Sequence, residues 1–119
     1  MASHNELGRK GEELACDYLS RKGYEIVCRN YRFEKAEIDI IAKKGGILSV
    51  VEVKARSGID FGRPEDSVSK KKIALLVKAA NQYVVENKLD VEVRFDIISV
   101  VKKSNTYSID LIENAFYFY

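Results

Sequence analysis

The chain has 119 residues, of which 46% are hydrophobic and 32% charged, and its formal net charge is +2. These values are typical of one globular domain, here residues 1–119, with enough chain to bury a core. No apolar run approaches membrane-spanning length and no signal peptide is recognisable, so we expect a cytoplasmic protein without a membrane partner. Cys16 and Cys28 have no zinc-site spacing, and we interpret both as reduced and structural.

Taken in chain order, the pattern predicts an α/β domain with the element order α-β-β-β-α-β-β. The expected elements are a helix over 5–22, a strand over 24–30, a hairpin of two strands over 37–55, a loop over 56–66, a helix over 69–87, and strands over 91–101 and 107–112. Gly8 and Gly11 fall inside the first helix, which indicates a close backbone approach or an irregular start. The aromatic tail 116–119 either docks on the domain, the interpretation we favour, or meets a second subunit in a homodimer.

The hairpin is the most informative segment. Gly45-Gly46 stands between two runs rich in β-branched residues, which is a strong signal for a two-residue turn. This turn pairs Lys44 with Ile47, and counting outward places Asp39 opposite Glu52. Ile41, Leu48 and Val50 then share the face of the two carboxylates, and Ile38, Ile40, Val51 and Val53 form the other face. Strands that are apolar on both faces are typical of a sheet covered by helices on both sides.

Two carboxylates in this register would have Cβ atoms about 4.5–5.5 Å apart, which normally destabilises a sheet. Beside apolar surface, ionised carboxylates must be paired or must bind a metal ion. Asp39 and Glu52 therefore predict a metal site, and oxygen ligands favour Mg²⁺ or Mn²⁺. Lys54 falls on the same face as Glu52. The competing interpretation is a solvated strand with an ordinary Glu37–Lys54 ion pair.

The same residues resemble a known signature. Asp39 followed by Glu52-x-Lys54 resembles the PD-(D/E)XK nuclease motif, and the predicted element order is similar to the restriction-endonuclease-like core, a central mixed sheet flanked by helices. A closer resemblance, over essentially the whole chain, is to the YraN-like bacterial family, which is similar to archaeal Holliday-junction resolvases. The segments that carry it are Gly11–Ala15, Gly23-Tyr24, Arg29–Arg32, Glu37–Asp39, Val51–Arg56, Lys72 and Arg94–Asp96.

The resemblance implies roles for particular residues. Asp39 and Glu52 correspond to metal-binding carboxylates, the Val53 carbonyl to a third metal ligand, and Lys54 to a catalytic lysine. Glu12 matches a further acidic residue in the first helix, with Glu13 as the competing choice. One departure from the signature is that isoleucine, not proline, precedes Asp39.

The resemblance therefore implies a Mg²⁺- or Mn²⁺-dependent DNA endonuclease. The basic side chains of Lys72, Arg56 and Arg29 would contact phosphates, which orients DNA without reading its sequence. Because the chain has no base-reading motif, we expect recognition of shape, including branched or junction DNA. The alternative is a catalytically silent module on the nuclease scaffold that binds nucleic acid or protein partners.

Overall fold

The protein is described by a computed structural model that covers residues 2–58 and 63–116, with side chains from Glu6 onward. Its elements are α1 (Ala2–Arg21), β1 (Glu25–Phe33), β2 (Ala36–Lys44), β3 (Ile47–Ser57), a short 3₁₀ helix η1 (Pro64–Ser67), α2 (Lys70–Glu86), β4 (Glu92–Lys103) and β5 (Thr106–Ile112). The predicted order α-β-β-β-α-β-β is confirmed. Neither helix in this part of the chain is long and apolar enough to cross a membrane.

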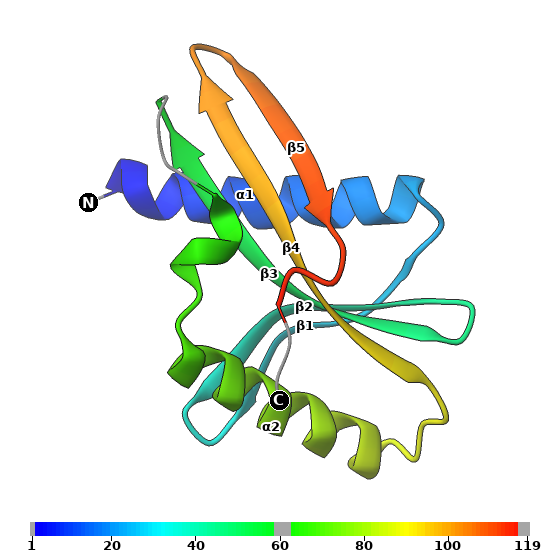
Figure 1. Ribbon diagram of the computed structural model, residues 1–119. Coiled ribbons are helices and arrows are strands. Elements are labelled where there is room, and N and C mark those ends of the chain that lie inside the picture. Colours follow the sequence, from blue (N-terminus) through cyan, green and yellow to red (C-terminus); the bar gives the residue numbers. More distant parts are fainter. Residues whose placement is uncertain (1, 59–62, 117–119) are drawn as a thin grey trace.

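The strands form one mixed sheet in the order β1-β2-β3-β4-β5, with β3 and β4 parallel and the other pairs antiparallel. Figure 1 shows α1 crossing one face of this sheet and α2 lying on the other. The α1 core contains Leu19, Ile40 and Val51. The α2 core contains Ile41, Leu76 and further residues. Both faces are covered, which explains the apolar runs on both sides of the hairpin.

The β2–β3 hairpin has the predicted register. Lys44 pairs with Ile47, and the ladder continues as far as Ile40 opposite Val51. Gly45, the first turn residue, has φ +59°, a backbone conformation that a two-residue hairpin needs and that glycine adopts without strain.

The prediction was wrong at Ile38, which lies in the α2 core together with Ile41, Leu48 and Val50. Ile40, Val51 and Val53 belong to the other core, as expected. Strict alternation in β2 fails because its pairing with β3 ends at Ile40, while its pairing with β1 continues through Ile38 opposite Tyr31. The strand is thus free to rotate where it leaves β3.

Several boundaries differ from the prediction. The first helix begins at Ala2, β1 continues to Phe33, and β3 continues to Ser57. The extension of β1 passes through Asn30, at φ +54°, and ends in a tight turn with Glu34 at φ +56°. Of the aromatic tail, Phe116 docks in the α2 core with its ring 5.6 Å from that of Phe95. The remaining residues, 117–119, lie outside the described part.

Helix α1 lies very close to β3 at Gly11. A Cβ built on Gly11 would lie 2.7 Å from the Cβ of Ala55, whereas one built on Gly8 would meet nothing within 4 Å. The close approach predicted for this pair of glycines is therefore confirmed at Gly11. It fixes the level at which the following residue, Glu12, lies over the sheet.

Alanine substitutions at the two glycines should change stability in opposite directions. Gly8→Ala gains helix propensity and should raise the free energy of unfolding by about 1 kcal/mol. Gly11→Ala must push α1 away from Ala55 and should lower it by about 1–3 kcal/mol. Urea unfolding of both variants measures the difference. Equal effects at the two positions would contradict the close packing of α1 on β3.

A buried polar network fixes the C-terminal segment to the sheet. Asp96 is fully buried and accepts hydrogen bonds from the Ser49 hydroxyl, from Arg94 Nε at 3.0 Å and from the Asn114 backbone N–H at 3.0 Å. Burial lowers the pKa of Arg94, but hydrogen bonds to Asp96 and Tyr24 outweigh it and hold this pKa above its ordinary value. Arg94 therefore stays charged beside Asp96 although its side chain is only 11% exposed.

Asp96→Ala should lower the free energy of unfolding by about 3 kcal/mol or more, because Arg94 then stays buried without its carboxylate. The matched control is Glu113→Ala, whose carboxylate is 55% exposed and lies 3.7 Å from Arg94. Loss of such an exposed pair should cost about 0.5 kcal/mol or less. Urea unfolding separates the two variants, and a small effect of Asp96→Ala would show that the network does not stabilise the fold.

Candidate active site

The candidate site lies where β2 and β3 part. After the last paired residues, Ile40 and Val51, the Asp39 side chain takes over the bonding between the strands: its Oδ2 accepts the backbone N–H of Val53 at 2.8 Å. This bond holds the Asp39 carboxylate beside β3, one residue from Glu52. The register prediction that brought the two carboxylates together is therefore realised through a side chain rather than through a further backbone pair.

Glu52 is the most buried of the three acidic residues at this site, Glu12, Asp39 and Glu52. Its side chain is 5% exposed, and its Oε2 contacts Lys72 Nζ and lies 3.6 Å from Lys54 Nζ. Glu37 instead pairs with Arg32, at 3.5 Å. The alternative of a solvated strand with a Glu37–Lys54 pair does not match this geometry.

These surroundings strongly shift the pKa of the Asp39 carboxyl. Burial, followed by the charge of Glu52, raises its pKa from 3.8 to about 7, although the Val53 hydrogen bond acts in the opposite direction. The charge of Glu12 raises it further, and that of Lys72 lowers it. A carboxyl in this position holds a proton near neutral pH unless a cation replaces it.

The first helix contributes Glu12 and not Glu13. Glu12 is 26% exposed, lies 3.6 Å from Arg29 Nη2 on β1, and is close enough to Asp39 to affect its ionisation. Glu13 points to solvent, where it pairs with Arg9 one turn away at 3.2 Å. The geometry thus separates two acids that the sequence alone leaves as alternatives.

The three predicted phosphate contacts occupy different positions. Lys72, on the first turn of α2, turns its ammonium inward onto Glu52. Arg29 lies on β1 beside Glu12, and Arg56 is half-buried near the end of β3. Lys72 and Arg29 each contact one of the acidic residues, Glu52 and Glu12 respectively. The contact between Lys72 and Glu52 was missed because the two residues belong to separate elements, 20 positions apart, with no local pattern to link them.

The donor set fits a hard divalent cation. Mg²⁺ is commonly bound by one or two carboxylates, while water and substrate phosphate complete its shell. Asp39 and Glu52 are two such carboxylates with oxygen donors only. No group of three or more His, Cys, Asp or Glu side chains in the described ranges is arranged to hold a metal ion. A divalent ion held here would therefore have Asp39 and Glu52 as its carboxylate ligands, and the Val53 carbonyl remains a predicted ligand.

Fold and site together define an α/β domain with a nuclease-like core, in which two strands bring an acidic pair and a lysine together. The chain belongs to the uncharacterised protein family UPF0102, whose model matches residues 11–100. It is 56% identical to a UPF0102 protein of Flavobacterium psychrophilum over 98% of both chains, and 56% identical to one of Christiangramia forsetii over 100% of both. A UPF0102 protein of Bacteroides fragilis is 48% identical over 98% of this chain and 97% of its own. These matches support the resemblance to the YraN-like family.

The raised pKa of Asp39 predicts an unusual pH dependence in metal-free protein. Its folded-state pKa, about 7, exceeds the ordinary value of 3.8, so the folded state binds the proton more tightly than the unfolded state. Stability should therefore fall as pH rises from about 4 to about 7, by at most about 1.4 kcal/mol per pH unit. Asp39→Asn keeps an acceptor for the Val53 N–H and removes this ionisation.

Urea unfolding in the presence of chelator, from about pH 4 to about pH 8, tests this difference. The free energy of unfolding of wild type relative to Asp39→Asn should decline with pH and then level off. Parallel curves for the two proteins would show that Asp39 ionises normally in the folded state.

Proposed function

We propose that the protein is a metal-dependent nuclease of the PD-(D/E)XK type that hydrolyses phosphodiester bonds in DNA. The observation that carries this proposal is the convergence of Asp39, Glu52 and Lys54 at the point where β2 and β3 part. A carboxylate pair with one buried member, one partly buried member and one strongly raised pKa is costly to a fold and is typical of functional sites. The family match is compatible with this activity and names none.

In the proposed reaction, Asp39 and Glu52 bind Mg²⁺ or Mn²⁺, with the Val53 carbonyl as a further ligand. When bound, the ion polarises the scissile phosphate and lowers the pKa of an attacking water. Lys54 places its positive charge beside the phosphate, where negative charge develops in the transition state. Glu12, held by Arg29, orients water near Asp39.

Lys72 has a second role in this scheme. In the metal-free protein its ammonium neutralises Glu52. Because its side chain is 41% exposed, it can move toward solvent when a divalent ion takes over that function. Its charge then becomes available to a DNA phosphate, as do those of Arg56 and Arg29. Such contacts favour a shape, such as a branch or junction, over a base sequence.

The second candidate function is a catalytically silent module that binds nucleic acid or a protein. The observation that favours it is the Lys72–Glu52 pair, since it compensates one of the two carboxylates without a metal. A silent module, however, gives the raised pKa of Asp39 no functional role. The two functions differ in whether metal ions stabilise the protein and whether DNA is cut.

Cleavage of branched, single-stranded and linear duplex DNA, with Mn²⁺ or Mg²⁺ and with chelator, tests the proposal. Asp39→Asn and Glu52→Gln should each reduce cleavage by about 100-fold or more. Lys54→Ala should reduce it similarly while it preserves the metal-induced rise in melting temperature, because it removes no ligand. Glu12→Gln should reduce cleavage, and Glu13→Gln, the matched control on the same helix, should not.

Thermal melts complete the test. Mn²⁺ should raise the melting temperature of wild type, because an ion that binds only the folded state stabilises it. The rise should be absent in Glu52→Gln. No metal-induced rise in wild type, together with a destabilised Glu52→Gln variant and uncut DNA, would contradict the nuclease proposal and favour the silent module.

A further inference from the structure

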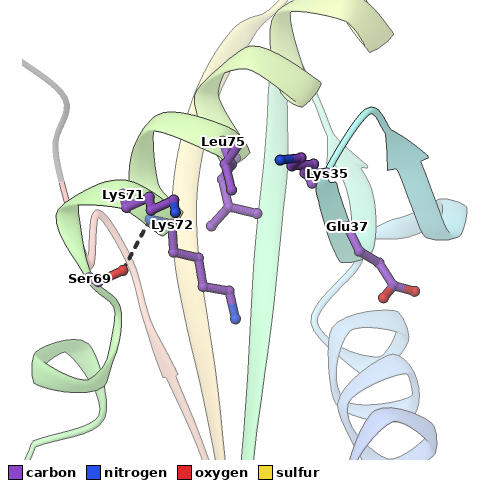
Figure 2. Close-up of a pocket in the computed structure, with 8 residues that line it drawn as sticks. Lys35, Glu37, Ser69, Lys71, Lys72 and Leu75 are labelled. Atoms are coloured by element: carbon purple, nitrogen blue, oxygen red, sulfur yellow. Dashed lines mark hydrogen bonds between the residues drawn. The ribbon is translucent and has the colours of Figure 1, made fainter.

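A second concave feature lies next to the candidate site, between the first turns of α2 and the tip of the β1–β2 hairpin. It has a volume of about 270 Å³. Its lining residues are Lys35, Ala36, Glu37, Ser69, Lys71, Lys72, Leu75 and Leu76. Figure 2 shows Lys35 extending from the hairpin toward α2, and Leu75 extending from α2 toward the sheet. The pocket is therefore formed where α2 packs against the β1–β2 hairpin.

The pocket is stably formed because the part of α2 that follows it is fixed to the β1–β2 hairpin. Lys78 donates to Glu34 at 2.7 Å, and the Tyr31 hydroxyl donates to Glu86 at 2.7 Å. The Tyr31 ring also meets Tyr83 edge-on, with centroids 5.1 Å apart. A ligand would thus find the two walls already in place.

The charges around the pocket favour an anion. Within the described part of the chain, neither Lys35 nor Lys71 forms an ion pair. The one acidic lining residue, Glu37, is neutralised by Arg32 at 3.5 Å, and Figure 2 shows its carboxylate extending away from α2. The Ser69 hydroxyl already accepts the Lys72 backbone N–H. The attraction therefore comes from two uncompensated lysines.

The floor of the pocket is apolar. Leu75 is half-buried, while Ala36 and Leu76 are 6% and 2% exposed. A free phosphate ion would gain nothing from this floor. A nucleotide would, because its base or sugar can cover the leucines while its phosphate meets the lysines. The volume lies just below the usual range for ligand pockets, so the pocket has room for a single nucleotide at most and not for a paired duplex.

We propose that this pocket holds one unpaired nucleotide of a DNA strand, with Lys35 and Lys71 on its phosphate and Leu75 beneath its base or sugar. The proposal rests on the proposed function and specifies its substrate: DNA with an unpaired nucleotide next to the cut phosphate. The connection is Lys72, which lines the pocket and whose ammonium reaches Glu52. The pocket and the carboxylates are thus one lysine side chain apart. A paired duplex keeps its bases stacked inside and can use only the lysines.

The test measures binding without cleavage, in chelator, so that it does not depend on the nuclease activity. Labelled DNA with a short unpaired flap and a fully paired duplex of the same sequence are titrated with the full chain, and anisotropy is recorded. Wild type should prefer the flap. Lys35→Ala and Lys71→Ala should each weaken flap binding by roughly threefold to tenfold and reduce the salt slope of log K by about 0.7.

Matched controls remove the general effect of charge. Lys70→Ala and Lys103→Ala remove exposed lysines outside the pocket and should leave flap binding close to wild type. At the floor, Leu75→Gln should reduce the preference for the flap over the duplex, whereas Leu75→Met, which stays apolar, should retain it. Melting temperatures verify that each variant is folded. If Leu75→Gln does not fold, the Leu75→Met variant keeps the test valid.

The outcomes separate the two proposals. Selective losses at Lys35, Lys71 and Leu75 support the pocket, even if no DNA is ever cut. If Lys35→Ala and Lys71→Ala bind like Lys70→Ala, or if wild type binds duplex and flap equally, the pocket proposal is overturned, although metal-dependent cleavage would still stand.

Discussion

The hydrogen bond from the Val53 N–H to Asp39 Oδ2 is the interaction on which the candidate site depends. It occurs where the β2–β3 ladder has ended, so a side chain supplies the acceptor that a backbone carbonyl would supply elsewhere. The strands can then separate while Asp39 and Glu52 stay together. Without this bond, β2 would carry Asp39 away from β3, and the acidic pair would not form.

The cost of that arrangement is visible in the charges around it. Asp39 is partly buried beside Glu52, and both effects oppose its ionisation. Glu52 itself is balanced by Lys72 and Lys54, and Glu12 by Arg29. Asp39 is the member of the group whose charge is least compensated, so it is the position where an added cation would gain most. Two helices and three strands must dock correctly for this balance to exist.

Much of this could be predicted from sequence because it depends on local rules. The Gly45-Gly46 turn and the side-chain period of two determined the register, and the register brought Asp39 and Glu52 together. The rotation of β2 at Ile38 was not predictable, since it follows from where pairing stops. The choice between Glu12 and Glu13 needed the packing of α1 on Ala55. The pocket at Lys35 and Lys71 needed the docking of α2, which no short motif encodes.

The β2–β3 hairpin also has a consequence for the order of folding. A two-residue turn closes a short loop quickly, whereas the parallel β3–β4 pair must wait for the α2 crossover between them. Asp39 and Glu52 therefore meet before Lys72 arrives with α2. For that interval the chain holds like charges together with Lys54 but without Lys72, a local conflict of the kind that slows descent to the native state. Acidity and divalent ions, which relieve this conflict, would act on the speed of assembly as well as on its end point.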